Sequence, residues 1–162
     1  KIDARLAAND AESAALKALR GKVAIANAKL AYGWWQGLVE GERWLKLAAH
    51  RAMPQRLLWA STGVKDPAYP DTLYVDALIG PETVNTMPVK TMDAFRDHGT
   101  ITQSLAADLD GARIILAEAE RLGLDLAGVT ASLVEDGVRQ FVDAFDQLLA
   151  AVAAKRKQLA EA

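Results

Sequence analysis

The chain has 162 residues, of which 51% are hydrophobic and 25% charged, a balance that predicts one folded domain with a core and excludes a disordered chain. Its formal net charge of -2 argues against a nucleic-acid-binding surface, which needs clustered positive charge. Cysteine is absent and no apolar run approaches the roughly 20 residues that span a bilayer, so we expect a cytoplasmic protein without disulfides, zinc-thiolate sites or a membrane partner.

Residues 1–53 are predicted to be helical. One helix is expected through residue 30, because its apolar side chains recur at spacings of three and four: Leu16, Leu19, Val23, Ala26 and Leu30. The adjacent Trp34 and Trp35 cannot share one helix face, so we expect one to pack and the other to cover a neighbouring surface. A shorter amphipathic helix around residues 44–48 follows.

Residues 54–99 change to a strand–helix rhythm. Residues 56–60 and 83–87 are short and bounded by glycine or proline, and the first is plainly apolar, as expected of buried parallel strands. Asp71 and Thr72 offer side-chain caps for a short helix that ends at Leu78. A second helix is predicted at 91–96, ended by the Asp-His-Gly that follows it.

The last third, residues 100–162, returns to helix. An apolar stripe between Leu109 and Leu122 predicts one helix, stopped by Gly123. Asp125 is expected to cap a second helix through Leu133, and apolar spacing over residues 138–152 predicts a third, longer one.

The resulting class is α/β, with two buried strands and about six helices. Two parallel strands leave both outer edges unpaired, which a soluble protein rarely allows. The first residue is Lys1, and the sequence opens directly into a helical pattern. We therefore expect the rest of the sheet to belong to a longer protein.

The segment QRLLWASTGVKDPAYPDTLYVDALIGPETVNTMP, residues 55–88, resembles the longer-chain bacterial transaldolases. That family carries W-A-S-T, K-[ND]-P-x-Y, D-T-L-Y-V and V-N-T-M-P in this order. The resemblance extends to LRGKVAIANAKLAY at 19–32, DAFRDHG at 93–99 and LVEDGVRQFVDAFDQLL at 133–149, and so covers nearly the whole chain.

The resemblance implies the C-terminal part of a (β/α)8 TIM barrel, predominantly helical as an isolated chain. Residues 56–60 would be strand 7 and residues 83–87 strand 8. Residues 1–53 would follow strand 6, residues 54–99 would form two strand–helix units, and residues 100–162 the C-terminal helices. Some similar sequences are fused to a phosphoglucose isomerase domain.

The implied activity is transfer of a dihydroxyacetone unit between sugar phosphates of the pentose phosphate pathway. A barrel lysine forms a Schiff base with the ketose, and no metal or organic cofactor is expected. The family places that lysine on strand 4, which this chain lacks. The resemblance therefore assigns no catalytic residue here and implies that the chain alone is inactive.

Ser61 follows the first predicted strand, where the family uses a serine to hold the substrate phosphate; the alternative is a loop serine that caps a local turn. The family has an arginine two positions later, where this sequence has Gly63. Lys65 could supply the missing positive charge, or could be an ordinary solvated lysine.

Three further polar residues have competing interpretations. Asn85 and Thr86 end the second predicted strand, where they could line the substrate pocket or simply satisfy each other's hydrogen bonds. His98 precedes a glycine at a helix end, a position that favours capping of backbone carbonyls over catalysis.

A second hypothesis concerns the chain by itself. Open strand edges and apolar helix faces favour association between copies. The chain would then be a non-catalytic, self-associating helical module.

Overall fold

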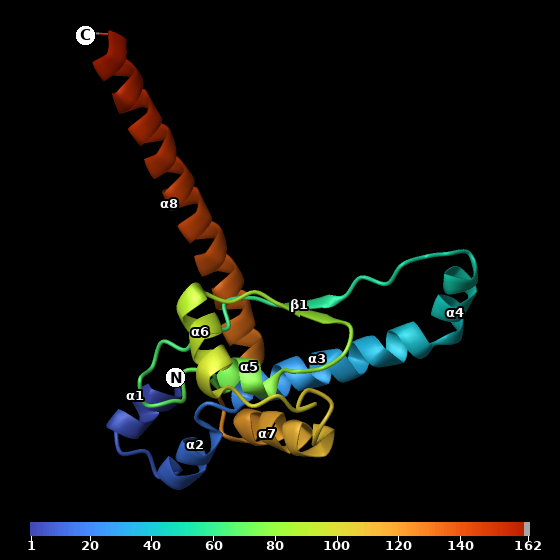
Figure 1. Ribbon diagram of the computed structural model, residues 1–162. Helices are drawn as coiled ribbons and strands as arrows, with labels where there is room; N and C mark the ends of the chain where they lie inside the picture. The colour runs from blue at the N-terminus through green and yellow to red at the C-terminus, as the bar shows by residue number, and fades with distance from the viewer. Residues whose placement is uncertain (161–162) are drawn as a thin grey trace. The chain divides into compact units, whose positions relative to one another are not determined.

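A computed structural model describes residues 1–160 (Figure 1). Residues 1–122 form one compact unit, and the chain from Gly123 onward forms a second. The described residues fold into eight helices and two short strands. The expectation of a predominantly helical chain with one parallel strand pair is therefore confirmed for these residues.

The first unit begins with three helices, where one had been expected through residue 30. They are α1 (Ile2–Ala7), α2 (Ser13–Leu19) and α3 (Val23–Glu40). The chain breaks at Gly21, whose φ of 73° is a left-handed conformation that glycine adopts without strain. A Cβ at this position would also lie 3.0 Å from the Tyr69 ring, so a larger residue at position 21 would crowd this ring.

Helix α3 runs past two glycines to Glu40, and α4 (Glu42–Ala49) follows. Trp35 is buried, stacks on Tyr32 with ring centroids 5.8 Å apart, and donates its indole N–H to the Gln55 carbonyl at 2.8 Å. Trp34 is 70% exposed. The expectation that only one of the two tryptophans packs into the core is confirmed.

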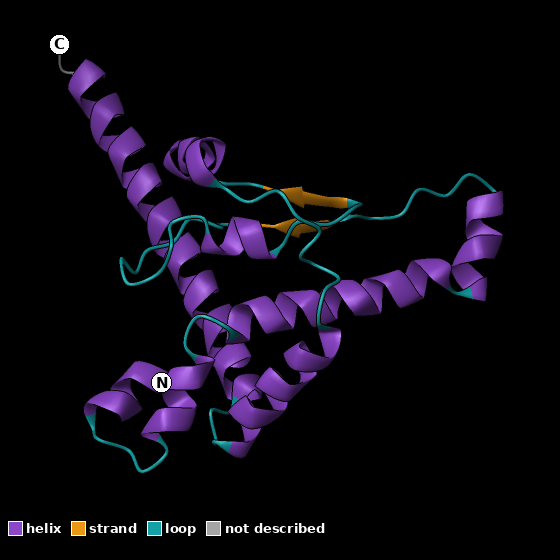
Figure 2. Cartoon of the chain, turned by 60° about the horizontal axis from the view of Figure 1, so that its bottom comes forward, coloured by secondary structure: helices purple, strands orange, loops and turns teal. Residues whose placement is uncertain are grey.

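The two strands are β1 (Leu57–Trp59) and β2 (Thr83–Asn85), which pair in parallel as expected (Figure 2). Leu57 lies opposite Thr83, and Trp59 opposite Asn85. Each strand is shorter than predicted, although the Thr86 N–H still donates to the Trp59 carbonyl at 2.9 Å. Because the strands are parallel, their carboxyl ends meet at the same edge.

Helix α5 (Leu73–Ala77) lies between the strands in sequence. The predicted side-chain cap is wrong, since the Thr72 hydroxyl instead donates to the Asp76 carboxylate at 2.6 Å. That carboxylate also accepts the Thr100 N–H at 2.9 Å, and the Asp76 carbonyl accepts the Ser104 hydroxyl at 2.5 Å. Asp76 thus ties α5 to the chain that follows α6 (Val89–His98).

The core of this unit gathers around Tyr32, Trp35, Leu78 and Leu105. Leu105 is fully buried, and its N–H donates to the Ile79 carbonyl at 3.0 Å. Helix α7 (Leu109–Arg121) packs along α3 and buries the apolar stripe predicted for it at Ala112 and Ala119 (Figure 1).

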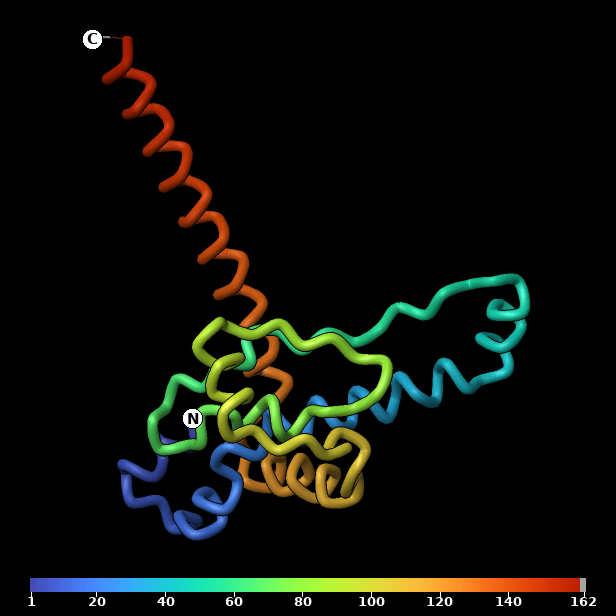
Figure 3. Tube along the Cα trace, viewed as in Figure 1, coloured from blue at the N-terminus to red at the C-terminus, as the bar shows by residue number. Residues whose placement is uncertain are grey.

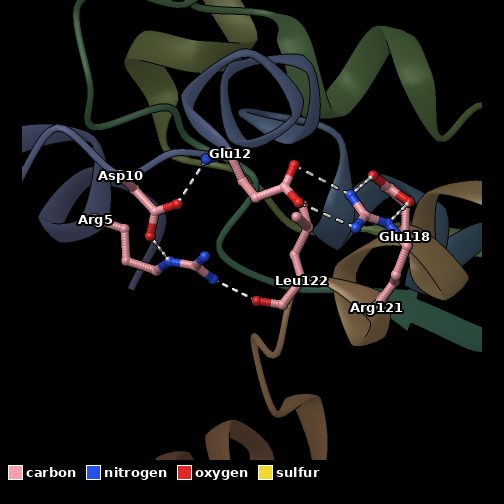
Figure 4. A network of polar contacts seen from close by, with 6 residues as sticks. All are labelled: Arg5, Asp10, Glu12, Glu118, Arg121 and Leu122. Atoms are coloured by element: carbon pink, nitrogen blue, oxygen red, sulfur yellow. Dashed lines mark hydrogen bonds and ion pairs between the residues drawn. The ribbon is translucent and has the colours of Figure 1, made fainter.

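The end of α7 is joined to the first two helices by a polar network (Figure 4). The Arg121 guanidinium contacts Glu118 at 2.7 Å and Glu12 at 3.2 Å, which raises the pKa of Arg121 and lowers that of Glu118. Arg5 bonds Asp10 at 2.7 Å, which lowers the pKa of that carboxyl, and also donates to the Leu122 carbonyl. These contacts join α1 and the start of α2 to the end of α7 within the first unit.

The second unit is built on α8 (Leu126–Ala160), a single helix of 35 residues (Figure 3). The prediction of two helices in this region is wrong, because no residue between 126 and 160 interrupts the helical backbone. Asp125 does cap it, as predicted, and accepts the Gly128 N–H at 3.0 Å.

Helix α7 begins with the same kind of aspartate cap. Asp108 has a positive φ of 54° and its carboxylate accepts the Gly111 N–H at 2.9 Å. Asp125 has a φ of 51° and bonds the glycine three residues later. At both glycines, a Cβ would overlap the carboxylate that makes the cap.

His98 ends α6 and differs from its predicted role as a carbonyl cap. Its ring nitrogens lie 2.9 Å from Asp71 and 3.1 Å from Asp97. The bond to Asp71, and then that to Asp97, raises the pKa of His98 above its ordinary value of 6.5. The bond to His98 lowers the pKa of Asp71 below 3.8.

These shifts predict a stability that depends on pH. The contribution of His98 is complete below pH 6.5 and is lost as the pH rises through its raised pKa; that of Asp71 is complete above pH 3.8 and is lost as the pH falls. We expect His98→Gln to lower the thermal midpoint at pH 5.5 more than at pH 8.5. His50→Gln, at the other histidine, is the control, and an equal loss at both pH values would exclude the ion pair as the cause.

Candidate functional site

The carboxyl ends of β1 and β2 carry polar side chains into one region. Ser61 lies two residues after β1 with a φ of 56°, a left-handed conformation that is strained for serine. The next residue, Thr62, is buried, and its hydroxyl donates to the Asn85 side-chain oxygen at 2.7 Å. The Thr86 carbonyl lies 3.4 Å from the same hydroxyl. Thr62 therefore connects the two strand ends.

A groove with a volume of about 510 Å³ opens beside this edge. Its walls come from α3, from β1 and the loop after it, and from α5. Most of the lining is apolar, with a few polar groups in the loop, which is the usual composition of a small-molecule site. The polar and charged groups that line it are Ser61, Thr62, Lys65, Asp66, Tyr69 and Tyr74.

Ser61 and Lys65 therefore line one groove, and both are exposed. Within residues 1–160, Lys65 makes no ion pair, whereas the neighbouring cation Arg20 forms ion pairs with Asp3 at 2.7 Å and Asp66 at 3.5 Å. Arg20 also lies 5.7 Å from the centre of the Tyr69 ring. The charge of Arg20 is shared between two carboxylates, so Lys65 is the ammonium at this groove that can meet an anion.

Asn85 and Thr86 are placed differently from the groove residues. Both lie at the carboxyl end of β2, as predicted, but neither is among the described residues that line the groove. The side-chain oxygen of Asn85 is occupied by Thr62. Asn85 and Thr86 both contact the Thr62 hydroxyl and do not bond each other's side chains in the described residues, so the choice between a pocket role and a structural role stays open.

Gly63 is where the resembling family has an arginine, and its surroundings explain the small residue. A Cβ here would lie 3.2 Å from Pro88 Cγ and 3.2 Å from Thr91 Oγ1, at the start of α6. A side chain would require α6 or its own loop to shift by a few tenths of an ångström. The close packing of this loop on α6 therefore leaves little space for a side chain at position 63.

Sequence reasoning missed Thr62, the residue that joins the strand ends. Its signal was weak, because a threonine after a strand is an ordinary loop residue until its burial is known. Over residues 1–160, no group of three or more His, Asp or Glu is placed to hold a metal ion. None of the described helices is both long enough and apolar enough to cross a membrane.

A second groove of about 500 Å³ lies between α3, α4 and β1. Its lining includes three tryptophans, Trp34, Trp35 and Trp44, together with Arg56 as its charged residue. With one titratable group among apolar walls, this groove offers no pair of groups for acid–base or nucleophilic chemistry. The groove at the strand ends, with its several polar groups, is the better candidate of these two.

Comparison with known proteins gives one consistent family. The profile described as Transaldolase/Fructose-6-phosphate aldolase matches residues 1–152. A transaldolase of Parafrankia sp. (strain EAN1pec) is 48% identical over 163 aligned positions, covering all of this chain and 43% of the relative. A transaldolase of Thermobifida fusca (strain YX) is 48% identical over 94% of this chain and 41% of the relative.

A transaldolase of Neisseria gonorrhoeae (strain ATCC 700825 / FA 1090) is 53% identical over 82% of this chain and 38% of the relative. The chain thus spans about two fifths of the length of these curated relatives.

Proposed function

The chain belongs to the transaldolase/fructose-6-phosphate aldolase family, and we propose that it is the C-terminal part of a cytoplasmic transaldolase. The whole enzyme would transfer a dihydroxyacetone unit between sugar phosphates of the pentose phosphate pathway. The relatives named transaldolase support this activity, since two of them match at 48% identity over nearly the whole chain.

The family implies a TIM barrel, and we assign β1 and β2 to its strands 7 and 8. In this assignment residues 1–53 follow strand 6, residues 54–99 form two strand–helix units, and residues 100–162 are the C-terminal helices. The parallel pairing of β1 with β2, with α5 between them in sequence, supports the assignment. The open outer edges of this pair are where strands 6 and 1 of a closed barrel would add.

We place the substrate phosphate at Ser61 and Lys65. The observation that carries this proposal is that both side chains line the groove at the carboxyl ends of two parallel strands. Active sites of TIM barrels lie at this end, and the loops after strands 7 and 8 frequently bind phosphate there. The Ser61 hydroxyl would donate to a phosphate oxygen, and the Lys65 ammonium would offset its charge.

We propose that Asn85 and Thr86, at the carboxyl end of β2, line the substrate pocket of the whole enzyme beyond the groove of Ser61 and Lys65. The Thr62 hydroxyl occupies the side-chain oxygen of Asn85, so the amide N–H groups of Asn85 are the donors that it could offer to a substrate. A sugar hydroxyl or phosphate oxygen can accept such a bond.

The covalent chemistry would come from outside this chain. A Schiff base needs a lysine that reaches the substrate carbonyl from inside the barrel, and β1 and β2 contain no lysine. In this proposal the chain holds the phosphate end of the sugar, while strands of the missing part supply the nucleophile and the acid–base groups. No cofactor is proposed.

The test uses fructose 6-phosphate and borohydride, which reduces a Schiff base to a stable amine. We expect the 162-residue chain to give no adduct by mass spectrometry. A chimera in which this chain replaces the matching segment of the Thermobifida fusca transaldolase should be trapped and should turn over sugar phosphates.

Two outcomes would contradict the proposal. An adduct on the isolated chain would mean that one of its own lysines is the nucleophile. A chimera that folds, as judged by circular dichroism, but neither reacts nor turns over would separate this chain from transaldolase activity.

A further inference from the structure

Asp66 opposes the ligand proposed for the groove at the strand ends. It follows Lys65 directly, and both side chains line this groove. A carboxylate at this place repels a phosphate and competes with it for the Lys65 ammonium. A phosphate site here therefore needs a group that offsets the charge of Asp66.

Arg20 is such a group. It comes directly after α2, and its Nη2 lies 3.5 Å from Asp66 Oδ2. Its Nε forms a second ion pair with Asp3 at 2.7 Å, and its guanidinium lies 5.7 Å from the centre of the Tyr69 ring. Arg20 is not among the described residues that line the groove, so it pairs with Asp66 without occupying the site.

The loop around Asp66 keeps this carboxylate in place. Its Oδ1 accepts the Ala68 N–H at 2.9 Å, and its backbone carbonyl accepts the Tyr69 N–H at 3.1 Å. The Tyr69 ring lies against Gly21, the residue after Arg20, where an added Cβ would come within 3.0 Å of the ring. One carboxylate oxygen of Asp66 thus bonds its own loop, and the other pairs with Arg20.

We propose that Arg20 is a positioning residue for the substrate phosphate. It offsets the charge of Asp66 and keeps this carboxylate from pairing with Lys65, which makes no ion pair within residues 1–160. The Lys65 ammonium then remains available to the phosphate. This inference rests on the proposed function and deepens it, because it explains how a site lined by a carboxylate still attracts an anion.

The alternative is that Arg20 binds the phosphate itself. Its guanidinium already faces two carboxylates and the Tyr69 ring, and it does not line the groove. The two roles predict different results when Asp66 is also changed. If Arg20 acts through Asp66, removal of that carboxylate makes Arg20 dispensable, whereas a direct phosphate contact would still be missing.

Kinetics of the Thermobifida fusca chimera test the role of Arg20. Arg20→Gln should raise KM for fructose 6-phosphate roughly two- to fivefold with kcat unchanged, the effect expected of one partly exposed ion pair. Arg20→Lys keeps the charge and should stay within about twofold of the unchanged chimera. Adding Asp66→Asn to Arg20→Gln should restore KM, since no carboxylate then remains to be offset. Asparagine also keeps an oxygen that can accept the Ala68 N–H.

Arg96→Gln is the matched control. Arg96 is exposed, pairs with Asp93 at 3.4 Å and does not line the groove. Its replacement also removes one positive charge and leaves one carboxylate unpaired, but it should leave KM unchanged. A difference between the two arginine variants therefore reports the position of the charge.

Salt provides a readout that a purely structural role would not move. The ratio of KM for Arg20→Gln to KM for the unchanged chimera should fall toward one between about 0.05 and 0.5 M sodium chloride, because salt screens exposed charges. A ratio that does not depend on salt would contradict an electrostatic role for Arg20.

Two further results would overturn the inference while the proposed function stands. An unchanged KM for Arg20→Gln in an active chimera would mean that Asp66 needs no partner. A double variant whose KM stays as high as that of Arg20→Gln would mean that Arg20 binds the phosphate itself or acts only through the fold.

A chimera without turnover would contradict the proposed function instead. The inference is then decided on the 162-residue chain, titrated with inorganic phosphate and followed by NMR. The dissociation constant should rise in Arg20→Gln and recover in the double variant. Equal dissociation constants in all three chains, or no binding to any of them, would overturn the inference.

Discussion

Leu105→Ala should lower the free energy of unfolding by about 2–5 kcal/mol, the usual cost of removing a buried leucine side chain. Leu105 is fully buried in the cluster of Tyr32, Trp35 and Leu78. Its side chain lies against Gly80, where an added Cβ would come within 2.8 Å of Leu105 Cδ2. Gly80 has no side chain that could move into the space, so the cavity would persist and the loss should fall toward the upper half of this range.

Urea unfolding followed by circular dichroism measures this effect. Ile101→Ala is the matched control, because Ile101 lies four residues away and is 83% exposed. We expect the control to change the free energy of unfolding by less than about 0.5 kcal/mol. Equal losses for both variants would mean that Leu105 is not part of the core that this structure gives it.

Ser61→Gly in the Thermobifida fusca chimera should raise KM for fructose 6-phosphate by roughly ten- to a hundredfold. The estimate follows from loss of one hydrogen bond to a charged group, about 1.5–3 kcal/mol. Glycine is the informative replacement, because Ser61 has a positive φ that glycine tolerates better than any other residue. Glycine relieves the backbone strain of the folded state but gives the unfolded chain more conformational freedom. These two effects oppose each other, so the free energy of unfolding should change by less than about 1 kcal/mol.

Lys65→Ala tests the charge at the same site and should raise KM in the same direction. Lys90→Ala is its control, since Lys90 is an exposed lysine that does not line the groove. Both lysine variants lose one positive charge, so a difference between them reports the position of the charge. An unchanged KM for Ser61→Gly and Lys65→Ala, with turnover intact, would place the phosphate elsewhere.

Features that depend on neighbouring residues were predictable from the sequence. Short runs at residues 56–60 and 83–87, bounded by proline and glycine, indicated two strands, and their parallel pairing is confirmed. Adjacent tryptophans on a helix must face different ways, and only Trp35 is buried. In each case the signal in the sequence is local, although the two strands that pair lie 26 residues apart.

Features that depend on distant contacts were not predictable. The apolar spacing through residue 30 does not reveal the break at Gly21, where the backbone has a positive φ and Tyr69, far along the chain, lies close by. The Asp76 carboxylate draws the Thr72 hydroxyl away from its expected cap, and bonds Thr100 as well. Two helices were predicted where α8 is one, because the apolar spacing through Leu133 and that from Val138 onward were read as separate stripes.

In the candidate site, too, residues with a local sequence signal were predicted, and a residue that depends on a distant contact was missed. Ser61 and Lys65 were chosen from a sequence motif, and the fold brings both to one groove. Their contact with a phosphate remains a prediction. Thr62 was missed because its role depends on Asn85, which lies 23 residues away in sequence and reaches it only through strand pairing.

The caps that begin α7 and α8 constrain how this sequence can evolve. Each cap needs an aspartate and, three residues later, a glycine whose missing Cβ leaves space for the carboxylate. A mutation to alanine at Gly111 or Gly128 would displace the carboxylate, and loss of the aspartate would remove the reason for keeping the glycine. In each pair the glycine keeps open the space that the carboxylate occupies, so alanine there would cost the helix its N-terminal cap.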